Sequence, residues 1–249
     1  MKLFNKIIFA VVVVALGACA EPDYPTATPS VTTQTSKVTI FHAMAGGPRI
    51  QMKIDNVVTA KDTLRYESKN GKFYNVLNLA VPAGPFRLVT ATNFDDGTDL
   101  ITDRNTVVAG TNYTAIVYYK AGTTIPTFRR ITDDLAAADV GFAKVRFLHY
   151  ALDAAEVKVT DVGNVNTVFS ARKYDEVSRG SGASAVDFTR FTSMPAGTVN
   201  FEVYATSGNT LLLSIPNLKL DSKSVYTIFL RGLIAGSGST SLGYTVVKH

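Results

Sequence analysis

Two histidines are the residues of this sequence best suited to chemistry, and each closes a similar apolar stretch. His42 ends "KVTIFH" and His149 ends "KVRFLH". An imidazole can act as a general base or a metal ligand, but zinc takes three or four protein ligands. The chain has 3 histidines, no HxxxH spacing and 1 cysteine. We therefore predict no metal site and interpret both histidines as neutral imidazoles that hydrogen-bond a backbone group with each ring nitrogen.

Other catalytic motifs give little support for an enzyme. The sequence has no GxSxG elbow and no GxxxxGK loop. The aspartates in Asp95–Asp99 surround a glycine, but their spacing differs from the calcium pattern DxDxDG, so we predict a hairpin turn there. We expect no enzymatic activity and no cofactor. A carbohydrate-acting or other hydrolytic enzyme of the cell envelope is the alternative, and it would need Asp153, Glu176 or Asp187 beside a histidine in a deep cleft.

The beginning of the chain resembles the signal of a bacterial lipoprotein. Residues 1–18 have a basic start and an apolar run, Ile7–Leu16, and the lipobox-like Leu16-Gly17-Ala18 precedes Cys19. That run is too short to span a membrane, which takes about 20 residues. We expect removal of residues 1–18, lipidation of Cys19, and an extended Pro/Thr-rich tether over residues 19–36. The predicted location is the outer membrane, with the folded part facing the periplasm or the cell surface.

Composition permits a large core and argues against nucleic-acid binding. The chain is 46% hydrophobic and 18% charged, which is ample for one large or two ordinary domains. The net charge of +5 includes two lysines of the signal, and no block of like charges occurs. We therefore predict no nucleic-acid partner. Because one cysteine cannot form an internal disulfide, stability must come from the core.

The part of the chain after the tether is a repeat. Three segments recur in the same order: Lys37–His42 as Lys144–His149, Val81–Leu88 as Met194–Phe201, and Tyr113–Thr114 as Tyr226–Thr227. Their spacing requires six extra residues in the second copy. Matches that stay in register over long stretches indicate duplication. We predict one domain at residues 37–133, a linker at 134–141 and a second domain at 142–249.

Each copy has the pattern of a β-sandwich. Residues Val199–Thr206 alternate between apolar and polar, and runs rich in Val, Ile, Thr, Tyr and Phe are separated by turn signals. These signals include Asn70-Gly71, Asp96-Gly97 and Gly208-Asn209. About 100 residues per copy matches an immunoglobulin-like sandwich. The predicted fold class is all-β: two tandem immunoglobulin-like antiparallel β-sandwich domains after a lipoprotein signal and tether.

The shared motifs suggest structural roles. Pro82 and Gly84 in the first copy, like Pro195 and Gly197 in the second, suit the second and fourth positions of a type I turn between two strands. A tyrosine opens the predicted sixth strand of each copy: Tyr113 and Tyr226. Each can hydrogen-bond back across the strand corner, as in the tyrosine corner of immunoglobulin-like domains.

Two surfaces are candidates for recognition. The insertion falls in a loop whose charged and aromatic residues are Arg172, Lys173, Tyr174, Asp175, Glu176 and Arg179. Loops on a rigid sandwich often carry binding, although a solvated loop with self-paired charges remains open. The strands "YTAIVYY" and "YTIFLR" are apolar on both faces. We expect the other copy, or else a partner protein, to cover Ile116, Tyr118, Ile228 and Leu230.

These motifs resemble the DUF4397 domain, which is found in secreted and lipid-anchored bacterial proteins, often in tandem. The segments "VRFLHYALDAAEVKV", "SMPAGTVNFEV" and "VYTIFLRG" carry the resemblance in the second copy, and the first copy follows it more loosely. The resemblance places His42 and His149 on the family's histidine and Asp153 on its aspartate, where the first copy has Gly46. It implies an extracytoplasmic immunoglobulin-like sandwich and no established activity. We expect a lipid-anchored binding or scaffold protein that engages an envelope or extracellular protein or a polysaccharide.

Overall fold

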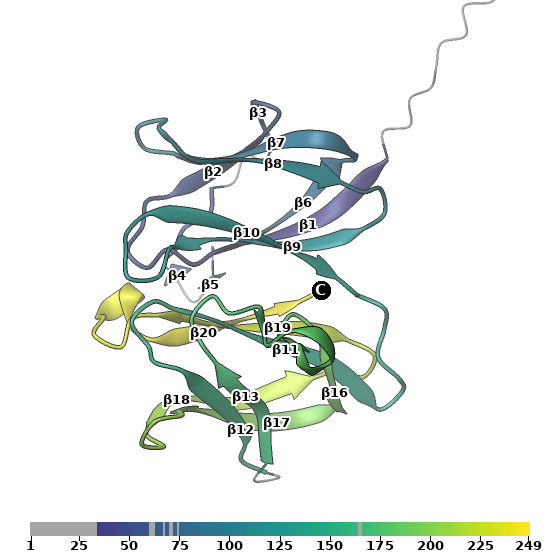
Figure 1. Ribbon diagram of the computed structural model, residues 1–249, viewed down its shortest axis with the longest axis vertical. Coiled ribbons are helices and arrows are strands. Elements are labelled where there is room, and N and C mark those ends of the chain that lie inside the picture. Colours follow the sequence, from purple (N-terminus) through teal and green to yellow (C-terminus); the bar gives the residue numbers. More distant parts are fainter. Residues whose placement is uncertain (1–33, 60–62, 67, 70–71, 74, 164–165) are drawn as a thin grey trace, which may run out of the picture. The chain divides into compact units, whose positions relative to one another are not determined.

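Eight strands of the first copy form two four-stranded sheets (Figure 1). The computed structural model describes residues 34–249 except 60–62, 67, 70–71, 74 and 164–165, and these belong to one unit, Thr33–His249. The first sheet has the order β10-β9-β1-β6 and consists of β1 (Thr35–His42), β6 (Val76–Pro82), β9 (Asn112–Tyr119) and β10 (Pro126–Asp133). The second has the order β3-β2-β7-β8 and consists of β2 (Ile50–Ile54), β3 (Val57–Val58), β7 (Gly84–Asn93) and β8 (Asp99–Val107). The short strands β4 (Ser68–Lys69) and β5 (Lys72–Phe73) pair with each other.

The second copy repeats this arrangement. One sheet has the order β16-β11-β19-β20 and consists of β11 (Phe142–Ala151), β16 (Thr192–Pro195), β19 (Val225–Gly232) and β20 (Gly243–Lys248). The other has the order β13-β12-β17-β18 and consists of β12 (Val157–Asp161), β13 (Asn166–Arg172), β17 (Gly197–Ala205) and β18 (Leu211–Leu220). A separate hairpin pairs β14 (Ser178–Arg179) with β15 (Val186–Asp187). The all-β prediction is therefore confirmed, as two sandwich-like halves.

The helical content of the described residues is two single turns, η1 (Gly182–Ser184) and η2 (Gly238–Thr240). No helix in this described part of the chain is long and apolar enough to cross a membrane. Strand β10 ends at Asp133 and β11 begins at Phe142, so residues 134–141 connect the halves without a strand. The predicted signal, Cys19 and nearly all of the tether lie outside the described residues.

The predicted purely antiparallel pairing is wrong at one position in each half. Strand β1 pairs in parallel with β9, and β11 pairs in parallel with β19, while the other pairs are antiparallel. Parallel neighbours need a long crossover connection, and here the chain passes through the second sheet of each half between the two strands. One feature of the sequence is typical of parallel strands: β9 and β19 are apolar, and they are buried on both faces.

Three apolar clusters hold the unit together. One lies between the two sheets of the first half and one between those of the second. The third lies between the halves, where the β1–β9 side of the first half meets the β11–β19 side of the second. At its centre the rings of Phe41 and Phe229 stack with centroids 3.9 Å apart. The two copies thus share a core, which we call the junction.

The prediction that the other copy covers four residues of the apolar strands is right for two of them and wrong for the other two. Ile116 and Tyr118 lie in the junction, but Ile228 and Leu230 face the core of their own half. Since Tyr226 matches Tyr113, the counterpart of Ile116 is Phe229, and Phe229 is the residue that reaches the first half. The error came from a register slip of one residue, which exchanges the faces of a strand.

The predicted type I turns at the Pro-Ala-Gly segments are not formed. Strands β6 and β7 are separated by Ala83 alone and belong to different sheets, as β16 and β17 are separated by Ala196. The segment therefore carries the chain from one sheet to the other. Gly84 and Gly197 have φ of +155° and +143°, a region essentially restricted to glycine. Pro82 and Pro195 end the strands before them, both at a sheet edge where a missing N–H is tolerated.

The tyrosine corners and two hairpin turns lie where the sequence places them. Tyr113 accepts a hydrogen bond from the N–H of Val108 at 3.1 Å, and Tyr226 accepts one from the N–H of Asp221 at 3.0 Å. The hairpins β7–β8 and β17–β18 turn at Asp96-Gly97 and Gly208-Asn209. The Asn70-Gly71 turn falls outside the described residues.

Candidate functional site

His42 is fully buried and closes the loop that follows β1. The N–H of Met44 donates to Nδ1 of the ring at 3.3 Å, so Nε2 carries the proton and donates to the carbonyl oxygen of Pro48 at 2.9 Å. A neutral imidazole therefore satisfies one donor and one acceptor of a buried loop. This is the bonding that the sequence suggested.

His149 repeats the arrangement in the second half. Its Nδ1 accepts from the N–H of Ala151 at 3.2 Å, and its Nε2 lies 3.1 Å from the carbonyl oxygen of Ala155. In the same loop the carboxylate of Asp153 accepts from two backbone N–H groups, those of Ile234 at 2.6 Å and Ala235 at 3.0 Å. Asp153 thus fastens this loop to the segment after β19. Glycine at position 46 in the first half has no such side chain.

Acid should destabilise the protein through these histidines. Burial lowers the pKa of His42 and of His149 to about 4, against about 6.5 in an unfolded chain. The unfolded state therefore binds protons that the native state excludes, and stability falls as pH drops from about 6.5 to about 4. We expect His149→Ala to cost about 1–3 kcal/mol at neutral pH by orphaning the loop groups, and to weaken this pH dependence.

Urea denaturation of wild type and His149→Ala across this pH range measures both effects. Burial also lowers the pKa of His249 to about 4, so the variant should keep part of the acid sensitivity. Equal unfolding free energies at neutral pH, with identical pH dependence, would contradict the assigned role of His149.

The predicted binding loop splits into parts with different roles, and its first part docks on the first half. Asp175 forms a bidentate ion pair with Arg129 of β10, with N–O distances of 2.6 and 2.8 Å. It also accepts hydrogen bonds from the hydroxyls of Tyr118 at 2.7 Å and Tyr150 at 3.3 Å. The hydroxyl of Tyr174 donates to the carbonyl oxygen of Tyr119 at 2.6 Å. Tyr174 and Asp175 therefore fasten the junction.

Electrostatics at this contact follow from its burial. Desolvation, with the adjacent Asp175 carboxylate, raises the pKa of Tyr118 to about 12. Arg129 is held charged, because its hydrogen bonds to Asp175 raise its pKa above the usual value. The sequence could not reveal this contact, since Arg129 and Asp175 are 46 positions apart and no periodic pattern links them.

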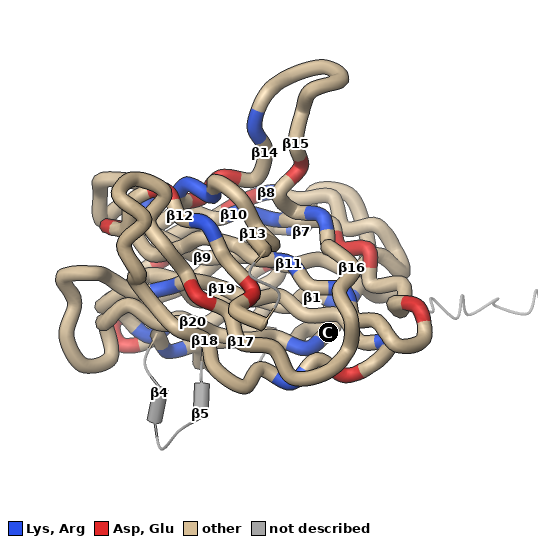
Figure 2. Tube along the Cα trace, turned by 90° about the horizontal axis from the view of Figure 1, so that it is seen from below, with Lys and Arg blue, Asp and Glu red and all other residues tan. Residues whose placement is uncertain are grey.

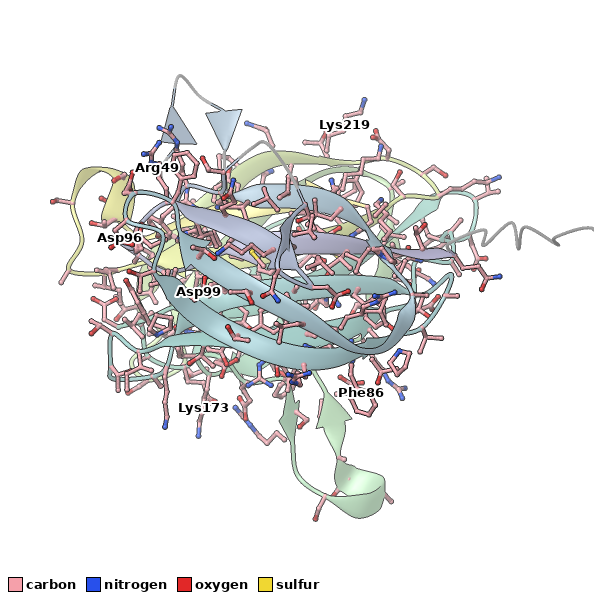
Figure 3. The ribbon with its side chains drawn as sticks, turned by 90° about the horizontal axis from the view of Figure 1, so that it is seen from above. Arg49, Phe86, Asp96, Asp99, Lys173 and Lys219 are labelled. Atoms are coloured by element: carbon pink, nitrogen blue, oxygen red, sulfur yellow. The ribbon has the colours of Figure 1, made fainter. Side chains whose placement is uncertain are left out.

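The next residues build the neck of the β14–β15 hairpin. Arg179 pairs with Glu176 and, at 3.3 Å, with Glu156. The guanidinium of Arg172 lies 4.0 Å from the ring centroid of Phe188, on the other side of the hairpin. Lys173 donates its backbone N–H to Glu176 at 3.1 Å, and its exposed side chain points outward in Figure 3. The self-paired charges that the sequence left open are thus present at Glu176 and Arg179.

Residues 180–187 of the hairpin are exposed throughout, and the turn between β14 and β15, residues 180–185, is its tip. Figures 2 and 3 both show the hairpin extending away from the sheets. Val186 is among its exposed residues, at 51%. The hairpin is therefore held firmly at its neck and free at its tip.

A buried charge network, which the sequence analysis missed, lies at one end of the junction. Arg146 pairs with Asp133 at 2.8 Å, and both side chains are almost completely inaccessible, at 0% and 1%. The same guanidinium donates to the hydroxyl of Thr114 in the first half at 3.0 Å and of Thr227 in the second at 2.9 Å. Burial lowers the pKa of Arg146, and Asp133 opposes that shift. An arginine within the apolar stretch "KVRFLH", where the first copy has threonine, was the available signal.

Two clefts on the surface of the described residues are large enough to hold a small ligand. One, of about 400 Å³, is lined by Gly46, Gly47, Pro48, Arg49, Arg65, Tyr66, Asp95 and Ser239. The other, of about 310 Å³, lies at the base of the hairpin and is lined by Thr132, Asp134, Lys144, Asp187, Thr189, Arg190 and Phe191.

Within the described ranges, no three His, Cys, Asp or Glu side chains group to hold a metal ion. At the aspartate-rich turn, where a hairpin was predicted, Asp95 pairs with Arg49, Asp99 with Lys53, and Asp96 accepts from the N–H of Thr98.

The ring nitrogens of the two motif histidines bond to backbone groups and not to the carboxylates named for a hydrolase. Asp153 and Glu176 are engaged as described, and Asp187 accepts from both the N–H and the hydroxyl of Thr189. The nitrogens of His42 and His149 are used by their own loops. These side chains therefore hold their own loops in place.

The fold and these features define an all-β protein of two sandwich-like halves that present a hairpin and shallow clefts. The chain belongs to the DUF4397 family, a domain of unknown function, whose profile matches residues 36–160. That single match runs from β1 into β12 and leaves the later motifs of the second copy outside. The predicted tandem of two such domains is therefore not confirmed at the level of the family, although the two halves share one topology.

Other comparisons add little. No curated protein matches the chain. Among solved structures it is similar to the crystal structure of CBMbc, a family CBM26 module of Eubacterium rectale Amy13K in complex with maltoheptaose. That similarity covers 86% of this chain and 97% of the module, at 12% sequence identity and a TM-score of 0.26. At this TM-score a common fold is not established, and nothing about the module's ligand transfers to this chain.

Proposed function

We propose that this protein is a lipid-anchored binding or scaffold protein of the bacterial envelope, which holds an envelope or extracellular protein or polysaccharide. The observation that carries the proposal is the β14–β15 hairpin. Its neck is fixed by buried and ion-paired contacts, and its tip is exposed. A rigid base lowers the entropy lost when a loop binds, so an exposed tip on such a base is well suited to recognition.

The position of the hairpin supports the same role. It lies in the segment where the second copy is longer than the first, and in the strand order it takes the place of the shorter β4–β5 pair of the first copy. Deleting the tip would remove no buried residue, since residues 180–187 are exposed. A segment that adds nothing to the core is available for contact with another molecule.

The anchor is the second part of the proposal. A signal ending at Ala18, lipidation of Cys19 and a tether to about residue 36 would hold the folded unit some tens of ångströms from the outer membrane. The unit would then face either the periplasm or the exterior. We assign it no catalytic role.

One experiment with two variants tests both parts. The full-length wild type, Cys19→Ala, and a variant with residues 180–185 replaced by Asn-Gly are expressed in the same cells. We expect wild type in the membrane fraction and Cys19→Ala in the soluble fraction. Chemical crosslinking should give discrete adducts for wild type and lose them for the tip variant, which should keep its thermal stability.

Two results would contradict the proposal. Unchanged membrane association of Cys19→Ala would remove the anchor. An adduct pattern that is the same with and without the tip would remove the hairpin as the recognition element.

A further inference from the structure

We propose that the cleft at the base of the hairpin binds a neutral sugar ring of a polysaccharide. This inference rests on the proposed binding function and names a ligand class for a specific site. The cleft is formed by both halves: Thr132 lies near the end of β10, Asp134 begins the connection, Lys144 lies on β11, and Asp187 ends β15. The wall that carries Asp187 is therefore the hairpin itself.

The cleft contains a fixed aromatic ring. Phe191 is held from behind by the guanidinium of Arg146, 4.4 Å from the ring centroid, and its ring meets that of His249 edge-on, with centroids 6.0 Å apart. It is only partly buried and lines the cleft. A rigid, partly exposed aromatic ring is a suitable surface for the C–H face of a sugar.

This platform belongs to the second copy alone. In the first copy, Thr39 and Asn78 occupy the positions of Arg146 and Phe191, and the threonine hydroxyl donates to the Asn78 carboxamide oxygen at 2.7 Å. Replacement of that polar pair by a stacked arginine and phenylalanine has placed an aromatic ring at the surface. It lies next to the segment in which the second copy is longer.

The polar groups around the ring favour a neutral ligand with many hydroxyls. Lys144 pairs with Asp134 at 3.3 Å, and Arg190 pairs with Asp187 at 3.4 Å. Each charge in the cleft is thus balanced by a neighbour, and an ionic ligand would have to displace an existing partner. Adjacent carboxylate and cationic groups offer acceptors and donors together, which suits neighbouring hydroxyls that both donate and accept.

The dimensions agree with a small unit of a longer chain. A volume of about 310 Å³ lies at the lower end of the roughly 300–1,000 Å³ of small-molecule sites. One or two rings would fit. A peptide is favoured less, because Phe191 is the one large apolar side chain in the lining.

Saturation-transfer NMR on the full-length protein in detergent tests the site. The probes are neutral tetrasaccharides of glucose, mannose, xylose and N-acetylglucosamine. We expect saturation of at least one of them, with an affinity reduced about tenfold or more by Phe191→Ala.

Phe191 covers a buried charge, so its loss could disturb folding. Arg190→Ala is therefore the second variant, because the Arg190 side chain is 83% exposed. Phe86→Ala, at a residue 72% exposed and outside the cleft lining, is the matched control and should bind as wild type does.

Three results would overturn the site. The first is that no tetrasaccharide shows saturation. The second is that the sugar binds equally well to wild type, Phe191→Ala and Arg190→Ala. The third is that a short peptide of alternating lysine and aspartate displaces the sugar. The tip variant separates this inference from the proposed function. If adducts depend on the tip but no sugar binds, the sugar site alone fails. If sugar binds but adducts do not depend on the tip, the hairpin role alone fails.

Discussion

Arg146→Met should lower the free energy of unfolding by about 3–5 kcal/mol, the usual cost of breaking a buried ion pair from one side. The change leaves the Asp133 carboxylate inaccessible to water. It keeps a hydrogen bond from the Thr114 hydroxyl at 2.6 Å but loses its compensating charge. The two threonine hydroxyls that Arg146 links across the junction also lose a donor.

Denaturant unfolding of the purified variant measures this loss. Arg190→Met is the matched control, because the Arg190 side chain is 83% exposed, and it should change stability by no more than about 0.5 kcal/mol. The double variant Arg146→Met/Asp133→Leu should recover a large part of the loss, since it removes both buried charges. A single-variant loss below about 1 kcal/mol, similar to that of an exposed ion pair, would mean that the network is open to water.

Phe229→Ala should cost a similar amount, about 3–5 kcal/mol, as is typical of a phenylalanine removed from a core. Phe229 is fully buried and stacks on Phe41 of the other half. Its removal opens a cavity at the centre of the junction, where Tyr150 also contacts it, with ring centroids 6.4 Å apart. The effect should therefore reach the contact between the halves as well as the second half.

Two readouts check this expectation. Phe86→Ala, in which an exposed ring is removed, should unfold within about 0.5 kcal/mol of wild type. Limited proteolysis between residues 134 and 141 should be faster in Phe229→Ala than in wild type. A variant as stable and as resistant as wild type would show that the two halves do not depend on their shared core.

Much of the fold could be predicted from the sequence, because repetition and alternation are local or periodic signals. The duplicated motifs gave the two halves, and the turn residues at Asp96-Gly97 and Gly208-Asn209 marked two hairpins. Strand direction was the first failure. The parallel pairing of β1 with β9 depends on the path of the chain between them, which apolar alternation does not record.

The Pro-Ala-Gly segments failed for a related reason. Proline and glycine at that spacing are compatible with a type I turn, but here the same residues allow a strand to continue into the other sheet. What decides between the two is the φ of Gly84 and Gly197, which a sequence does not reveal. The match between the two Pro-Ala-Gly segments could show only that both halves make the same kind of connection there.

The candidate site was predicted in outline and misassigned in detail. The insertion is the place where the copies diverge, but its most conspicuous residues, Tyr174 and Asp175, are half-buried and bonded to the carbonyl of Tyr119 and to Arg129. Contacts between distant segments have no sequence signature. The exposed part is the small-residue tip, whose glycine, serine and alanine residues carry no chemical signal in the sequence.

The most direct test of the proposed role is site-specific photocrosslinking in intact cells. A photoreactive residue is placed at Ser184 in the hairpin tip or, as a control, at Lys219, whose side chain is 80% exposed and belongs to β18 rather than to the hairpin. The account predicts discrete, reproducible adducts from position 184 and none of these from position 219. Adducts that are identical from the two positions, or absent from position 184, would contradict recognition by the hairpin.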